Sequence, residues 1–524
     1  MRRRNVLLRL ALVASVGLAA SACGDSGGGD GAGGAGANGR ITVGGYNYKT
    51  LDPGGTGYIS KSVPISLDVY GSLFDPPTAK GGDFVPDLAT GYKYSDDLKT
   101  LTIELRQGVT FSDGTPFDAE AVVYNFERYK QAESPNAQYF RQMSSVTASG
   151  EHQVTMTFTE PTATMVAFLT YTPATLIGSP TAHKKAGQQQ FGLKPVGAGP
   201  FEIVSHKPGE ELVLKPFEKY WDRANVHLAE VKFINTSPEA QVSYQHVASG
   251  SIDSVQVSGV STPPNVLDDA KANQKIATIA GENTLYAFLP INTFKPPFNR
   301  PEARQAINYC TDRDSIATNV QRGWVTPAYV LAGADSLYYP DGGVDGAKAQ
   351  FPYPFDPVKG KALVDQLGGL EFDLLNIGGH SQVISNALAQ QWQQCGIKAQ
   401  VKAVQGPQLS EAYSDGTYQM AYAFSGGIDD PQFYTSFQSP NTPQGKHGFA
   451  REHPEVPELI QSANRTVDPE VRRTTWRKVW TSMNDLAVDI PIISGPNYTF
   501  QNKCLADVDF AAVGAQFKSA RLTC

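Results

Sequence analysis

The sequence of 524 residues lacks several features that would place it in a common functional class. It has no excess of positive charge, since 44 Lys and Arg stand against 51 Asp and Glu, and the net charge is −7. Nucleic-acid binding needs a basic surface and is therefore disfavoured. The eight His and five Cys form no His-x-x-x-His or Cys-x-x-Cys pair, so we expect no metal site. No cofactor motif is present either, and we expect no cofactor.

After the first 22 residues there is no second apolar run long enough to cross a membrane. The first 22 residues begin with three arginines and continue as an apolar stretch, which predicts a signal peptide over 1–22. Ala20-Ser21-Ala22 before Cys23 resembles a bacterial lipoprotein signal, in which the cysteine becomes the lipidated first residue. An ordinary signal peptide with an uninvolved Cys23 is the alternative, and the general and twin-arginine export routes both stay open.

Residues 23–39 combine this cysteine with a stretch of Gly, Ala, Ser, Asp and Asn that has almost nothing to bury. We expect a flexible tether. The tether contains a G-x-S-x-G pattern at residues 24–28, but a nucleophile of that type sits between a strand and a helix. We therefore reject a hydrolase site there.

The whole sequence has 41% hydrophobic residues. After the tether, strand and helix patterns alternate, which indicates an α/β protein with a large core. Acidic or polar residues followed by proline predict several helix starts. The expected helices begin at Thr115–Asp118, Asn299–Pro301, Asp312 or Asp314, Asp356–Pro357 and Asp468–Pro469, and a buried strand is expected over Asp489–Ile493.

Several blocks occur in one order along this region. They are Leu51-Asp52-Pro53, Pro86-Asp87-Leu88-Ala89, the stretch Leu105–Phe117, Gly197-Ala198-Gly199-Pro200-Phe201, Ala303–Ile307 with Asp312-Arg313, the Asp356-Pro357 helix, and Asp468-Pro469 through Pro491. Taken together, they resemble the extracytoplasmic solute-binding proteins of ABC importers, of the large peptide and nickel type. The resemblance covers nearly everything after the tether.

The resemblance implies a fold of the α/β class: a two-lobed, periplasmic-binding-protein-like structure of type II, in its large three-segment variety, with a cleft and a hinge between the lobes. The first lobe is expected from three separate segments, with a subdomain inserted into it, and the hinge from two crossings near 284–290 and 488–494. The expected ranges are 40–70, 180–285 and 490–524 for the first lobe, 71–179 for the inserted subdomain and 286–489 for the second lobe.

The same resemblance implies a binding protein and not an enzyme, and no catalytic constellation is visible in the sequence. The expected role is to capture a peptide or similar small organic solute and to deliver it to the permease of an ABC transporter. We expect a monomer held by its lipid at the outer face of the bacterial cytoplasmic membrane. A surface sensor or chaperone-like lipoprotein is an alternative, as is a binder of a non-peptide solute such as an opine, a sugar or a metal chelate.

Peptide-binding relatives hold the ligand's amino group with an Asp four residues before a Pro. The matching position before Pro431 is Gly427, which puts recognition of ordinary free peptides in doubt, and Asp429 is either a replacement or a turn residue. Phe424 either lines the cleft or belongs to the core of the lobe. The full set of predicted ligand contacts is Tyr46, Tyr58, Ser60, Tyr286, Asn292, Phe424, Ser425, Gly426, Gly427 and Asp429.

The odd number of cysteines leaves four once Cys23 is assigned to the lipid, an even number in an exported protein. Cys504 with Cys524, and Cys310 with Cys395, are the candidate disulfides. For the second pair, two buried free thiols are the alternative.

Overall fold

The computed structural model describes residues 39–55, 58, 62–77, 82–134, 136–426, 447–511 and 514–524. Cys23, Ser60, Gly427 and Asp429, together with the predicted signal peptide and nearly all of the tether, lie outside the described residues. Within the described ranges, none of the helices has both the length and the apolar character needed to span a membrane.

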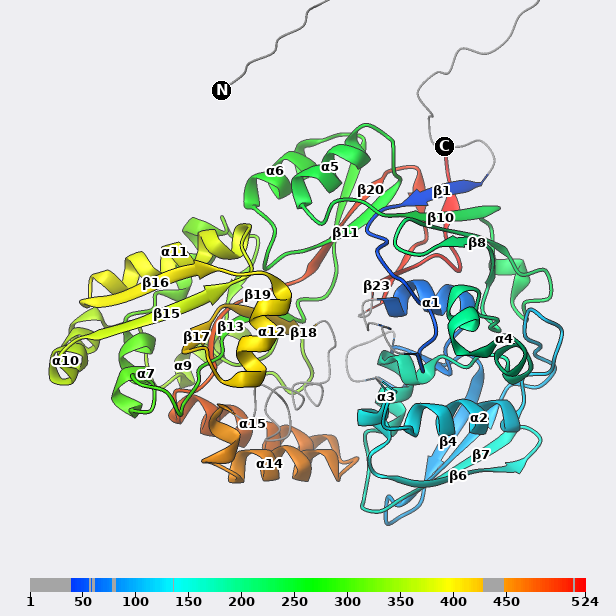
Figure 1. Ribbon diagram of the computed structural model, residues 1–524, viewed down its shortest axis with the longest axis horizontal. Coiled ribbons are helices and arrows are strands. Elements are labelled where there is room, and N and C mark those ends of the chain that lie inside the picture. The colour runs from blue at the N-terminus through cyan, green and yellow to red at the C-terminus, as the bar shows by residue number, and fades with distance from the viewer. Residues whose placement is uncertain are drawn as a thin grey trace, which may run out of the picture.

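A seven-stranded sheet is assembled from three distant parts of the chain (Figure 1). Its order is β12-β20-β11-β1-β10-β9-β8, with β1 parallel to both of its neighbours and the remaining pairs antiparallel. The strands are β1 (Arg40–Val43), β8 (Phe201–Lys207), β9 (Glu211–Pro216), β10 (Glu230–Ile234), β11 (Ser254–Ser258), β12 (Ile276–Ala280) and β20 (Asn497–Asn502). Helices that accompany this sheet are α1 (Val63–Tyr70), α4 (Pro180–Leu193), α5 (Ala240–Ala248) and α6 (Pro264–Ala272), and the chain ends in β21 (Leu505–Ala506), β22 (Asp509–Ala511), β23 (Gly514–Gln516) and β24 (Arg521–Leu522).

The segment between α1 and α4 builds a separate antiparallel sheet with its own hydrophobic core, drawn in blue and cyan in Figure 1. The sheet order is β4-β5-β7-β6, and apolar residues such as Leu101 and Ile103 alternate with polar ones along β5. The elements are β2 (Phe74–Asp75), β3 (Val85–Pro86), β4 (Ala89–Tyr94), β5 (Thr100–Leu105), α2 (Ala119–Lys130), β6 (Met143–Gly150), β7 (Gln153–Phe158) and α3 (Met165–Tyr171).

The remaining part of the chain contains a four-stranded sheet, β14-β19-β13-β18, and a parallel three-stranded sheet, β16-β15-β17. The strands are β13 (Leu285–Leu289), β14 (Thr326–Pro327), β15 (Leu370–Asn376), β16 (Ile397–Ala403), β17 (Met420–Ala421), β18 (Ala423–Gly426) and β19 (Ile490–Gly495). The helices are α7 (Pro301–Tyr309), α8 (Arg313–Ser315), α9 (Gly343–Gln350), α10 (Pro357–Leu367), α11 (His380–Gln393), α12 (Gly406–Asp415), α14 (Glu455–Asn464) and α15 (Pro469–Asp485).

Local capping explains why most predicted helices start where they do. Asp356 and Asp468 precede a proline, and each side chain accepts hydrogen bonds from main-chain N–H groups of the first turn. The helix expected from Thr115 begins later, at Ala119, because Asp118 is its N-cap. The helix expected to begin at Asp312 or Asp314 consists of the short α8, capped by Asp312, followed by a π-helical turn over Ile316–Val320.

The chain passes twice between the seven-stranded and the four-stranded sheet. The first crossing lies between the end of β12 and the start of β13 at Leu285, and the second lies at Pro496, between β19 and β20. Residues 490–495 were expected in the first lobe, but they form β19, which pairs with β13 of the second lobe. The second crossing therefore falls just after the expected range 488–494. Two connections of this kind allow one lobe to rotate against the other.

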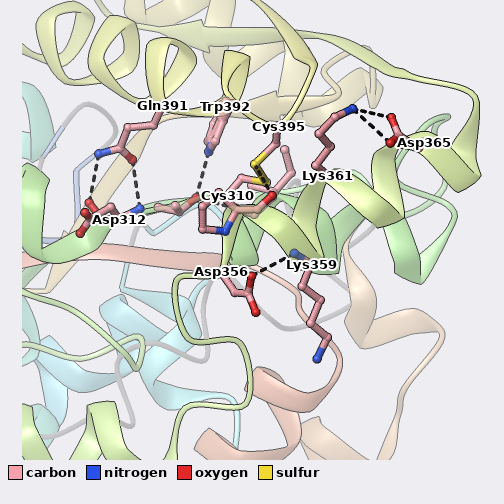
Figure 2. Close-up of a disulfide and its surroundings, with 12 residues drawn as sticks. Cys310, Asp312, Asp356, Lys359, Lys361, Asp365, Gln391, Trp392 and Cys395 are labelled. Carbon is pink, nitrogen blue, oxygen red and sulfur yellow. Dashed lines mark hydrogen bonds and ion pairs between the residues drawn. A yellow bond between two sulfur atoms is a disulfide. The ribbon is translucent and has the colours of Figure 1, made fainter.

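Two disulfides tie elements together. Cys504 is bonded to Cys524 near the C-terminus, and Cys310, at the end of α7, is bonded to Cys395, just after α11. Figure 2 shows the second bridge among further contacts: the Gln391 side chain bonds both the N–H and the C=O of Asp312, and the Trp392 indole N–H donates to the Thr311 hydroxyl at 2.9 Å. The bridge therefore fastens α7 to α11 within the second lobe.

Candidate functional site

The hinge end of the four-stranded sheet is where both crossings meet. Leu285 pairs with Gly495 on one side and with Gly426 on the other, so the starts or ends of β13, β19 and β18 lie next to one another. Interlobe positions of this kind are where two-lobed proteins hold small ligands. This end of the sheet is therefore the candidate site.

A row of four hydroxyl side chains runs across this sheet, one residue in from the hinge end. Thr326 is paired with Ser494, Ser494 with Tyr286, and Tyr286 with Ser425. Directly paired residues in antiparallel strands point to the same face, so the four share one side of the sheet. The hydroxyls of Thr326 and Ser494 are 2.8 Å apart. We call these four residues the hydroxyl row.

The outer strand at this site is β18. It pairs with β13 on one side and, among the described residues, has no strand on its other side. An edge strand offers main-chain N–H and C=O groups to an extended ligand. Gly426 has φ +101°, and a Cβ there would lie 2.2 Å from the Thr284 carbonyl oxygen, so only glycine fits this close approach of β18 to β13.

Four predicted ligand contacts are brought together here: Tyr286, Phe424, Ser425 and Gly426 all lie on β13 or β18. Phe424 is half-buried and packs against the core on the face opposite Tyr286. Tyr286 is itself 1% exposed and belongs to a buried cluster on the other face, so both rings pack within the lobe, and a ligand contact by either stays a prediction. Thr326 and Ser494 were not predicted; the one signal for Ser494 was that it ends an apolar run over Ile490–Ile493.

Three other predicted contacts have their polar groups engaged within a lobe. The Tyr46 hydroxyl hydrogen-bonds to His206, and the Tyr58 hydroxyl donates to Ser66 at 3.1 Å. The buried Asn292 amide donates to the main-chain oxygens of Gly416 and Tyr418 at 3.0 and 3.2 Å. These bonds give the three side chains a packing role, and a ligand contact by any of them stays a prediction.

A contact beside the hinge joins α6 of the first lobe to the loop after the π-helical turn. Asp268 accepts hydrogen bonds from the Trp324 indole N–H and from the Arg322 guanidinium, both at 2.8 Å. The Trp324 indole N–H, and after it Arg322, hold the pKa of the Asp268 carboxyl below its usual value. This link keeps α6 and the second lobe in contact near the crossings.

Charged and neutral groups both surround the site: the Asp335 carboxylate accepts from the Asn283 N–H at 2.8 Å, and the Asn283 amide donates to the Thr326 hydroxyl at 3.2 Å. His380 at the start of α11 hydrogen-bonds to the Gln321 side chain, and burial lowers its pKa to about 4, so the ring is neutral at neutral pH. Within the described ranges, no three His, Cys, Asp or Glu side chains are grouped so that they could hold a metal ion. Within the hydroxyl row, Thr326 and Ser425 are half-buried, whereas Tyr286 and Ser494 are 1% and 0% exposed.

Solved structures share this fold over almost the whole chain. The ABC transporter substrate-binding protein CtaP from Listeria monocytogenes matches with a TM-score of 0.78 at 21% identity, covering 93% of this chain and 99% of CtaP. NikA from Brucella suis, in complex with Fe(III)-EDTA, gives 0.79 at 21% identity over 92% and 99% of the two chains. DppA from Helicobacter pylori, in complex with the peptide STSA, gives 0.76 at 20% identity over 93% and 98%. The protein therefore has the two-lobed fold of type II binding proteins, as expected from the sequence.

Sequence comparison identifies the family. The family model described as bacterial extracellular solute-binding proteins, family 5, matches residues 83–446, and the chain belongs to this family. It is similar to the glutathione-binding protein GsiB of Shigella flexneri, with 28% identity over 447 residues, 82% of this chain and 83% of GsiB. GsiB of Escherichia coli strain K12 matches to the same extent. The protein is thus a solute-binding protein of ABC importers and not an enzyme.

Proposed function

We propose that this protein captures a peptide or a similar small organic solute between its lobes and delivers it to an ABC transporter permease. The observation that carries the proposal is the edge strand β18 at the hinge end of the four-stranded sheet. An extended solute placed along β18 pairs with its main chain, in the way that peptides add to exposed sheet edges. The hydroxyl row lies on the same sheet, immediately inside the hinge end.

The names of the relatives support a peptide-like solute. GsiB is named as a glutathione-binding protein, and the DppA structure contains the peptide STSA. Glutathione is itself a small peptide, so these two names agree on the chemical class, whereas the NikA structure contains Fe(III)-EDTA. The sequence lacks an Asp at position 427, which favours a solute that does not depend on a carboxylate for its amino group.

The test is to purify the protein under native conditions, denature it, and identify the released small molecules by mass spectrometry. We expect glutathione or short peptides in about equimolar amount, and added glutathione should raise the melting temperature by mass action. Release of non-peptide solutes alone, across independent preparations, would overturn the peptide assignment while leaving solute binding intact. Release of nothing, with no thermal shift from glutathione or from short peptides, would contradict the proposal as a whole.

We further propose that the mature protein is a monomer anchored through lipid on Cys23 at the outer face of the cytoplasmic membrane. The support is the sequence around Cys23 and the extracellular character of the family. Cys23→Ala should move the protein from the membrane fraction to the soluble fraction without changing its solute content. An unchanged membrane fraction would contradict the anchor.

A further inference from the structure

The two lobes also touch at a place far from the crossings. The inserted subdomain supplies residues 160–163, between β7 and α3, and the second lobe supplies residues 464 and 465, at the end of α14. The Ala163 N–H donates to the Asn464 carbonyl oxygen at 3.0 Å. The Arg465 guanidinium pairs with the Glu160 carboxylate. We call these four residues the closure contact.

A buried arginine lies on α15, the helix that follows the closure contact along the chain. Arg472 on α15 is 8% exposed, and its guanidinium carbon lies 5.1 Å from the ring centre of Tyr338 in the same lobe.

The closure contact lies far from the two crossings, so it is sensitive to rotation of one lobe against the other. In Figure 1, α14 reaches toward the inserted subdomain at the bottom of the molecule, whereas β11 and β20, next to the crossings, lie well above it. A rotation about the crossings moves distant atoms most. The link between Asp268 and Trp324 lies beside the crossings and moves little, whereas the closure contact separates as soon as the lobes open.

We propose that the closure contact stabilises the closed arrangement of the lobes and so raises the affinity for solute. This inference rests on the proposed function, since closure around solute is what gives the contact its effect. Any interaction made only in the closed state shifts the equilibrium toward that state and strengthens whatever binds it. The pair is partly solvated, with side chains 45% and 36% exposed for Arg465 and Glu160. A pair of this exposure changes the ratio of closed to open forms by about two- to five-fold.

The test measures the opening of the lobes without needing the natural solute. Dyes on Glu151→Cys and Val358→Cys, in a Cys23→Ala background, report the distance between the inserted subdomain and the second lobe by single-molecule energy transfer. Both labelling positions are more than 80% exposed. Glu160→Arg and Arg465→Glu should each raise the ratio of open to closed molecules about two- to five-fold. The double reversal should restore the original ratio, because it recreates the pair with opposite signs.

The matched control is Arg477→Glu on the same helix as Arg472. Arg477 pairs with Asp341, which belongs to the same lobe, so its reversal should leave the distance distribution unchanged. Arg465→Gln, a milder change, should act in the same direction as Arg465→Glu if the reversed variant folds poorly. Distance distributions equal to that of the parent in all folded variants would overturn the proposal. A failure to find any solute by mass spectrometry would not alter these distances, so the two proposals fail separately.

Discussion

Removing the disulfide between Cys310 and Cys395 should cost more stability than removing the one between Cys504 and Cys524. The perturbation is the double substitution Cys310→Ala with Cys395→Ala, compared with the corresponding pair at the C-terminus. Both sulfurs of the first bridge are buried, and the bridge joins elements 85 residues apart in the sequence. The second bridge spans 20 residues.

The magnitude follows from the loops that the two bridges close. A cross-link restricts the unfolded chain, and the chain-entropy model gives about 4.5 kcal/mol for a loop of this longer length and about 3 kcal/mol for the shorter one. Packing adds to the difference. A Cβ placed on Gly360 of α10 would lie 2.2 Å from the Cys310 sulfur, so α10 lies directly on the bridge and loses that contact when the sulfur is removed.

The assay is urea unfolding of the two double variants and the parent, followed by tryptophan fluorescence, since Trp392 lies next to the bridge (Figure 2). Gly360→Ala provides an internal check. It should destabilise the parent strongly, and much less the variant without Cys310, because the atom that blocks its methyl group is gone. If the Cys310–Cys395 variant loses no more free energy of unfolding than the Cys504–Cys524 variant, the argument from loop length is refuted.

Three further predictions concern other parts of the structure. A thiol reductant under native conditions should open Cys504–Cys524 before Cys310–Cys395, because Cys524 is exposed. Alkylation of the freed thiols followed by mass spectrometry gives the order of opening, and the reverse order would contradict the prediction. Burial raises the pKa of Asp489 to about 7, above the unfolded value near 4, so the folded state holds an extra proton between these pH values. As the pH rises through that range, the free energy of unfolding falls by about 1.4 kcal/mol per pH unit. Asp489→Asn should remove this slope in urea titrations, and an unchanged slope would exclude Asp489 as its source. Gly426→Ala should lower both the melting temperature and the amount of co-purified solute, because the new methyl group would lie 2.2 Å from a main-chain carbonyl oxygen. The control is Gly108→Ala, with φ +74° and open space around it, which should retain the solute. Equal solute in both variants would contradict the role of β18.

Much of the fold could be predicted because its signals are local. Asp356 and Asp468 before proline mark helix starts, and the alternation in Leu101–Leu105 marks a strand, since both depend on a few neighbouring residues. The exception at Asp312–Arg322 also has a local cause. There the chain changes from α8 to a π-helical turn, which residue spacing alone does not indicate.

Pairing between distant segments was harder to predict. Residues 490–495 read as a buried strand, but nothing in their sequence says that the partner is β13 and not a strand of the other sheet. The candidate site shows the same limit. Tyr286 and Ser425 were both predicted, whereas Ser494 and Thr326 were missed, because only the register of four strands brings these hydroxyls into one row.

The place of β20 in the seven-stranded sheet has a consequence for how the protein is made. β20 lies between β11 and β12, although it is synthesised long after both of them. Until Asn497–Asn502 has emerged, those two strands have no partner between them, and the four-stranded sheet likewise waits for β19. Neither sheet is therefore complete before nearly the whole chain is available. The inserted subdomain differs, because all four strands of its β4-β5-β7-β6 sheet precede residue 159 and can pair while the rest of the chain is still being made.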